Sequence, residues 1–249
     1  LRGCPQTNKN TTKKGNRMSA PVNVGIYLFE NMTMLDGYAP LQIFSLVKEF
    51  NCFTFGTTAK PTVCDSGVML LPQYSLVDCP DLDVIVMPGG GNVLPPIEDQ
   101  ALMKFLTSQG PRARYVTSVC SGALILAEAG LLDGYRATTH WAWKKDFAEH
   151  YPEVEVLDER VVVDRNRITG GGITAGVDFA LTVIAEILGV VPAQAIQLLV
   201  EYCPQPPFDA GSPISAPEEI VNAVEDQCSE VIAPLRNYLA SKTKSSVKT

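Results

Sequence analysis

Several features that define common classes of protein are scarce or missing in this 249-residue chain. It has only two histidines, and its seven cysteines never form a Cys-x-x-Cys pair. An odd number of scattered cysteines argues against a disulfide framework and a zinc site, and it is typical of a reducing cytosol. So few histidines also make a histidine-rich metal centre unexpected. The expectation is a cytoplasmic protein without a metal ion.

Long apolar runs and a recognisable leader are also missing. The apolar run over residues 122–132 is too short to cross a bilayer and contains Glu128. Residues 1–17 carry five basic side chains and no acid, but no apolar signal segment. We expect residues 1–20 to be an N-terminal extension that is either disordered or added to the natural chain, with Met18 as a candidate natural start. One domain should then cover residues 21–240, with a polar tail over 241–249.

Basic residues are scarce in the body of the chain. Residues 18–240 hold all 27 acidic residues but only 12 of the 20 basic ones, so their net charge is 12 minus 27, or −15. Such a body should repel nucleic acid and acidic membrane surfaces, and neither is expected as a partner.

The pattern of apolar residues alternates between strand and helix. Expected strands cover residues 22–29, 52–57, 83–87, 115–119, 136–139, 154–157, 160–163 and 167–169. Expected helices cover residues 37–50, 99–109, 123–132, 142–150, 175–188, 192–202 and 217–240. Residues 63–71 should form a small hairpin, and a tight turn should join 154–157 to 160–163. This order predicts an α/β fold whose mostly parallel sheet is flanked by helices on both faces.

A candidate nucleophile lies where the strand over 115–119 turns into a helix. Cys120 stands in Ser-Val-Cys-Ser-Gly, and a Ser-x-Cys-x-Gly turn is the thiol version of the nucleophile elbow. A helix N-terminus at this point would favour the thiolate, and the following N–H could stabilise developing negative charge. The alternative is a buried, unreactive cysteine. The position on the turn favours the nucleophile.

Other residues could share a site with this thiol. Asp36 follows the first strand, and its spacing favours a helix cap over a carboxyl group that reaches the site. The loop Gly89–Gly91 could present N–H groups to a ligand or act only as a turn; without Gly-x-Gly-x-x-Gly it predicts no dinucleotide cofactor. His140 could act as a base or orienting partner, or simply pack on Trp141.

Three motifs carry a family resemblance. Residues 116–122, 130–141 and 169–176 resemble the ThiJ/PfpI superfamily, and Pro-Pro-Phe-Asp-Ala-Gly-Ser-Pro at 206–213 is similar to the isocyanide hydratases within it. The resemblance covers about residues 22–221. It implies a flavodoxin-like fold of the class I glutamine amidotransferase type. It also implies a cofactor-free homodimer that acts on a small molecule.

The resemblance also implies residue roles. The nucleophile falls on Cys120 and its carboxyl partner on Asp36, which can then cap and catalyse. Ser121 stands where hydratases usually have Thr, and with N–H groups near Gly89 and Gly90 it would orient developing charge or water. Peptidase and amidotransferase activities are not expected, because no His follows Cys120 and the chain has no His-x-Glu pair.

The implied reaction is the hydration of an isocyanide to an N-substituted formamide through a thioimidate on Cys120. Two alternatives stay open: a cofactor-free glyoxalase or deglycase, and a non-catalytic ligand-binding or redox-sensing relative. AraC-type regulators share the elbow and the Thr138–Trp141 block. They need a basic helix-turn-helix domain, for which the acidic body and short tail leave no room.

Overall fold

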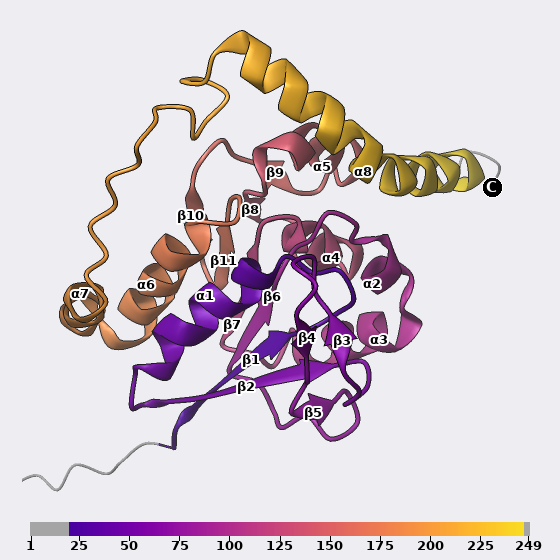
Figure 1. Ribbon diagram of the computed structural model, residues 1–249. Coiled ribbons are helices and arrows are strands. Elements are labelled where there is room, and N and C mark those ends of the chain that lie inside the picture. Colours follow the sequence, from indigo (N-terminus) through magenta and orange to yellow (C-terminus); the bar gives the residue numbers. More distant parts are fainter. Residues whose placement is uncertain (1–19, 247–249) are drawn as a thin grey trace, which may run out of the picture.

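The computed structural model describes residues 20–246, and a seven-stranded sheet forms its centre (Figure 1). The strand order is β10-β11-β7-β6-β1-β2-β5, and every neighbouring pair is parallel except β10 and β11. These strands are β1 (Val22–Tyr27), β2 (Phe50–Gly56), β5 (Tyr74–Ser75), β6 (Val84–Met87), β7 (Tyr115–Val119), β10 (Val161–Asp164) and β11 (Arg167–Gly170). The predicted mostly parallel α/β sheet is confirmed.

Helices cover both faces of this sheet (Figure 1). On one face lie α1 (Met34–Ser45) and α6 (Ala175–Leu188), with α7 (Val190–Leu199) packed outside α6. Phe44 of α1 meets Phe179 of α6 edge-on, with 6.2 Å between the ring centroids. On the other face lie α2 (Leu94–Glu98), α3 (Gln100–Gln109) and α4 (Gly122–Glu128). The core therefore occupies two layers, one on each side of the sheet.

The remaining described elements lie outside the seven-stranded sheet and the helices that cover it. They are the antiparallel pair β3 (Thr62–Val63) and β4 (Met69–Leu70), the parallel pair β8 (Arg136–Ala137) and β9 (Glu155–Val156), the 3-10 helix η1 (Trp141–Trp143), α5 (Lys144–His150) and α8 (Glu218–Ser246). The pair β3–β4 confirms the expected hairpin. Among residues 20–246, no helix is both long enough and apolar enough to span a membrane.

Some expected boundaries were wrong. The tight turn expected between β9 and β10 does not form: residues 157–160 link the two strands without a turn, β9 pairs with β8, and β10 forms a hairpin with β11 whose turn places Arg165 at φ +54°. Helix α1 begins at Met34 and ends at Ser45, and Leu46 is 37 % exposed rather than inward. Helix α8 continues six residues into the expected polar tail, whereas the expected N-terminal extension lies almost wholly outside the described residues.

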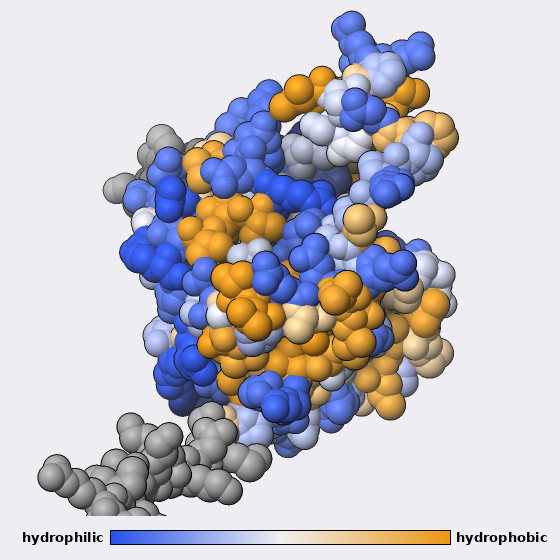
Figure 2. All heavy atoms as spheres, turned by 90° about the vertical axis from the view of Figure 1, so that its left-hand side faces the viewer, coloured by the Kyte–Doolittle hydropathy of each residue, from blue (hydrophilic) through white to orange (hydrophobic). Residues whose placement is uncertain are grey.

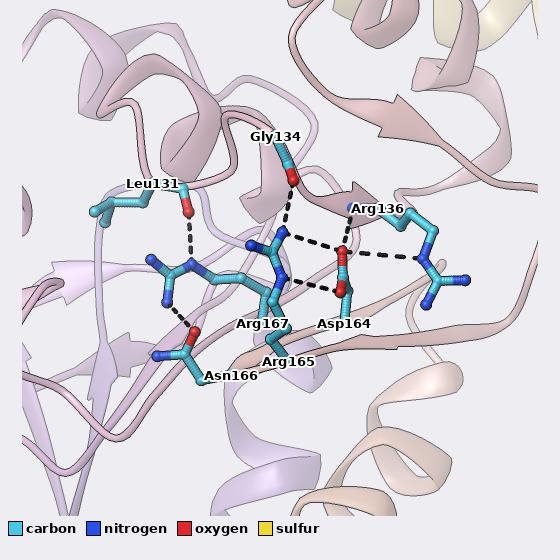
Figure 3. Close-up of polar contacts among 7 residues, drawn as sticks. All are labelled: Leu131, Gly134, Arg136, Asp164, Arg165, Asn166 and Arg167. Atoms are coloured by element: carbon cyan, nitrogen blue, oxygen red, sulfur yellow. Dashed lines mark hydrogen bonds and ion pairs between the residues drawn. The ribbon is translucent and has the colours of Figure 1, made fainter.

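The β10–β11 hairpin braces the loop that follows α4 (Figure 3). Arg167 is buried and donates from Nε to the Leu131 carbonyl at 2.6 Å. Arg165 donates from Nη2 to the Gly134 carbonyl at 2.6 Å. Both guanidinium groups lie over the Tyr135 ring, at 3.6 and 4.6 Å from its centroid. This network fixes the segment that leads from α4 into β8 and on to His140.

The sheet changes its winding direction next to β1. From β1 the chain passes through α1 to β2 on one side, and it later returns to β6 on the other side of β1. In open α/β sheets, ligands bind at the carboxyl ends of the strands beside such a switch point. The loops after β1, β6 and β7 meet at this place.

Candidate active site

Cys120 occupies the strained turn between β7 and α4. Its backbone lies in the left-handed region at φ +58°, which is uncommon for a residue with a side chain. Its N–H is shared by the carbonyls of Gly170 and Gly171, at 3.0 and 2.8 Å, and its own carbonyl accepts a 2.8 Å hydrogen bond from the Thr139 hydroxyl. The surrounding chain therefore holds the strained conformation, as a nucleophile elbow requires.

Two glycines let the neighbouring backbone come close to this turn. A Cβ at Gly122 would lie 2.1 Å from the Met87 carbonyl oxygen. A Cβ at Gly89 would lie 2.5 Å from the Ser121 nitrogen. Only glycine fits at either place without a shift of backbone. The Ser-x-Cys-x-Gly motif is thus matched to the loop that follows β6.

Asp36 lies in the first turn of α1 and is fully buried. Its Oδ2 accepts a 3.1 Å hydrogen bond from the Gly89 N–H, whereas Oδ1 has no hydrogen-bond partner among the described residues. The expected capping role is wrong, because Thr33 is the N-cap and Asp36 stands three residues inside the helix. The carboxyl group instead reaches across to the loop after β6, beside Cys120.

Burial dominates the acid–base behaviour of this pair. It raises the pKa of the Asp36 carboxyl to about 7, although contacts with the Cys120 thiol and the Gly89 N–H oppose the rise. Burial, and then the negative charge of Asp36, raise the pKa of the Cys120 thiol, which outweighs contacts with Ser121. The expected preference for thiolate at the helix N-terminus is therefore overridden. The two groups titrate as a unit, and the first proton leaves near neutral pH.

Ser121 and the glycine loop bind each other. The Ser121 hydroxyl donates to the Gly90 carbonyl at 2.7 Å and accepts from the Gly90 N–H at 3.0 Å. The Gly89 N–H is engaged by Asp36. The expectation directed these groups toward substrate or water. In the structure these contacts fix the loop against the elbow, and the role toward substrate or water stays a prediction.

His140 lines the same pocket as Cys120. Its Nδ1 accepts the Ala142 N–H at 3.3 Å, its ring lies 5.6 Å from that of Trp141, and it packs against Gly172. Burial, followed by the charge of Lys144, lowers the pKa of His140, so the ring is neutral at neutral pH. The expected packing on Trp141 is therefore observed, and His140 also caps the 3-10 helix η1, while its place in the pocket puts it where a substrate would bind.

The pocket above Cys120 has a volume of about 480 Å³. Its walls include Gly90 and Gly91, the aromatic and aliphatic side chains of Trp143 and Ile173, and one face of α8. Sequence reasoning missed the contribution of α8, because nothing in a helical pattern tells which distant element covers a loop. Asp36 does not line the pocket and lies behind Cys120. Within residues 20–246, no three His, Cys, Asp or Glu side chains form a group that could hold a metal ion.

This arrangement can add a sulfur nucleophile to a small electrophile and move a proton beside it. The thiol stands at the pocket floor, and a carboxyl group whose pKa lies near 7 can both give and accept a proton at neutral pH. The apolar walls suit an uncharged molecule.

Comparison with known proteins places these features in a family. The model of the DJ-1/PfpI family matches residues 22–186. An isonitrile hydratase from Pseudomonas putida is 45% identical over 201 residues, which are 81% of this chain and 87% of that protein. The family match thus includes the elbow, Asp36 and the pocket residues that lie outside α8.

Two other relatives differ in extent. The crystal structure of a ThiJ/PfpI family protein from Pseudomonas syringae is 35% identical, with a TM-score of 0.81 over 91% of this chain and 95% of that one. The HTH-type transcriptional regulator GbdR from Pseudomonas aeruginosa is 25% identical over 80% of this chain but only 53% of its own length. The chain thus spans about half of that regulator.

Proposed function

The chain belongs to the DJ-1/PfpI family, and from this membership and the site we infer that it is an enzyme that hydrates isocyanides, also called isonitriles, to N-substituted formamides. The observation that carries this conclusion is the 45% identity to an isonitrile hydratase along nearly its whole length. The family resemblance given by the sequence motifs is confirmed. The cysteine mechanism below is our proposal.

In the first step, Cys120 adds to the terminal carbon of the isocyanide. A sulfur–carbon bond forms, the Asp36 carboxylate takes the thiol proton, and the resulting carboxylic acid gives that proton to the same carbon. The product is a covalent thioimidate, in which carbon is bonded to sulfur and hydrogen and doubly bonded to nitrogen. The raised pKa of Asp36 supports this role, since a group that titrates near neutral pH can serve in both directions.

In the second step, water adds to the thioimidate carbon. Asp36 takes one proton from the water and passes it to the substrate nitrogen, which gives a tetrahedral adduct that carries a hydroxyl group. Collapse of this adduct forms the formamide C=O bond, breaks the carbon–sulfur bond and moves the hydroxyl proton to the Cys120 sulfur. The contacts of Asp36 support its exchange of a proton with the Cys120 thiol, because the carboxyl group contacts that thiol and its Oδ1 has no other hydrogen-bond partner in the described part of the chain. We assign Ser121, Gly89 and Gly90 to positioning, and His140 to contact with bound substrate.

A covalent intermediate is the feature that tests this mechanism. We expect Cys120→Ala to abolish formamide production from benzyl isocyanide. Mass spectrometry of the native protein after rapid acid quench should show a substrate-sized adduct on the peptide that contains Cys120. Cys203→Ala is the control, because Cys203 is an exposed cysteine outside the pocket. Undiminished turnover in Cys120→Ala would refute the assignment, and a parallel assay with methylglyoxal would reveal a glyoxalase instead.

We also propose a homodimer in the cytoplasm. The patch on α7 formed by Val190, Val191, Leu198 and Leu199 supports the dimer, because these side chains are 62 to 82 % exposed in the single chain. Figure 2 shows hydrophobic residues gathered on the side where α6 and α7 lie. Apolar patches of this kind commonly mark protein interfaces. The scattered, free cysteines support a reducing compartment.

A further inference from the structure

Helix α8 forms the wall of the pocket on the side opposite Cys120 and Asp36. Its residues Val224, Gln227, Cys228, Val231 and Ile232 all line the pocket. Their offsets of three, four, seven and eight positions place them along one face of the helix. The chain therefore closes its site with an element more than one hundred residues beyond the nucleophile.

This wall is in direct contact with the glycine loop after β6, which packs against the Cys120 turn. A Cβ at Gly91 would lie 2.8 Å from a methyl carbon of Val231, so α8 packs closely against the loop that follows β6. Further along, Ile232, Leu235 and Leu239 are buried, and Arg236 pairs with the buried Asp146 of α5. The wall is thus anchored in a defined position above Cys120.

The chemistry of an isocyanide determines which part of it meets this wall. The group is linear, with the reactive carbon at its end and the substituent on the nitrogen at the opposite end. When the carbon is at the Cys120 sulfur, the substituent therefore points away from the pocket floor. Val224, Val231 and Ile232 offer aliphatic contacts there. The lining of the pocket contains no Lys or Arg, and its one carboxylate, Asp65, accepts a 3.1 Å hydrogen bond from the Met34 N–H.

We infer that this face of α8 holds the substituent of the substrate and limits its size. The inference rests on the proposed isocyanide hydration and extends it to the substrate class, namely isocyanides that carry an uncharged alkyl or aryl group. Cys228 is the most useful position for a test, since its side chain is half-buried at the middle of the lining face. The next residue, Ser229, is exposed and lies off that face.

The test compares Cys228→Phe with its matched control, Ser229→Phe. In Cys228→Phe the added ring occupies space that the substituent of the substrate would need. The value of kcat/KM for benzyl isocyanide should therefore fall about tenfold more than the value for methyl isocyanide, because a pocket separates substrates by steric fit. In Ser229→Phe both values should stay within about twofold of the parent. An equal change for both substrates in Cys228→Phe, or no change, would overturn the inference.

A second measurement does not depend on turnover. The rate of Cys120 alkylation by N-benzylmaleimide, relative to N-methylmaleimide, should fall about tenfold in Cys228→Phe and stay unchanged in Ser229→Phe. If the parent protein hydrates neither isocyanide, the proposed function is refuted, whereas this ratio still supports or overturns the role of α8. If circular dichroism shows that Cys228→Phe is unfolded, Val224→Phe replaces it, with the exposed Ala223→Phe as control.

Discussion

The backbone turn at Cys120 and the burial of both side chains together determine how Cys120 and Asp36 hold their protons. The turn brings the sulfur to the pocket, and burial then disfavours a negative charge on either group. Below pH 7 the pair holds two protons, and above it one proton is left to be shared. The reactive form of the site is therefore the singly charged pair, and this charge state depends on both residues.

The pH profile should reveal this shared proton. We expect kcat/KM of the native protein to rise through a pKa near 7, as the pair loses its first proton, and to fall only at strongly alkaline pH. Asp36→Asn should lower kcat about a hundredfold or more, since general acid–base groups typically contribute that much, and should remove the rise near pH 7. A rise that persists in Asp36→Asn would show that another group titrates.

The free energy of unfolding of Asp36→Asn should also change, in a direction that follows from the raised pKa of Asp36. The folded pKa of Asp36 is raised to about 7 from 3.8, so the folded state holds the extra proton between these values and loses stability as pH increases from about 4 to 7. At pH 8, Asp36→Asn should therefore gain up to about 4 kcal/mol in the free energy of unfolding, measured with urea. Asp226→Asn, on an exposed part of α8, is the control.

At the scale of the element, α8 differs from the helices that cover the sheet. Its second half is buried through Leu235 and Leu239, whereas much of its first half is exposed, with Ile220 at 46 %. Pro234 lies inside the helix between these parts and removes one backbone hydrogen bond. The segment over residues 210–213 lines a small pocket together with Trp141 and the first turns of α8. The hydratase-like motif thus borders the helix that closes the pocket.

The ion pair between Arg236 and Asp146 should decide how firmly α8 is held. Arg236→Met leaves the buried Asp146 carboxylate without its two hydrogen bonds, at 2.7 and 3.0 Å, and should cost about 3 kcal/mol in the free energy of unfolding. Lys145→Met removes an exposed pair with Glu149 and should cost less than about 0.5 kcal/mol. Equal losses in the two variants, by urea unfolding, would contradict this anchoring role.

At the scale of the whole molecule, two surfaces serve different purposes. The carboxyl edge of the sheet gathers the loops after β1, β6 and β7 into the reactive site. On the side of α6 and α7, the α7 patch leaves four large apolar side chains exposed. A second copy of the chain is the occupant that we propose for this patch.

The oligomeric state should follow the α7 patch. We expect the native protein to elute with twice the chain mass in size-exclusion chromatography with light scattering. Leu198→Glu should weaken self-association at least tenfold, since a buried charge without a partner disfavours the interface. Leu71→Glu is the control, because Leu71 is 62 % exposed outside the patch. A native monomer at micromolar concentration would refute the dimer.

The sequence by itself determined the parts of this protein that depend on local pattern. Periodic apolar residues predicted the alternating strands and helices, and the Ser-x-Cys-x-Gly motif predicted a turn that the structure confirms at φ +58°. Small residues and β-branched runs affect the backbone conformation only within a few positions of themselves. The local structure that they favour can therefore be predicted directly from the sequence. The family motifs in the sequence likewise indicated an isocyanide hydratase.

Only the tertiary structure decided which groups meet across long intervals of chain. In the structure, Asp36 is not a helix cap but accepts a hydrogen bond from Gly89, fifty-three residues away, and the Ser121 hydroxyl donates a hydrogen bond to the Gly90 carbonyl. The tertiary structure also placed α8 over Cys120 and raised the pKa of the thiol that a helix N-terminus alone would lower. Burial and long-range contacts arise from the packing of the whole chain, and no local pattern contains them.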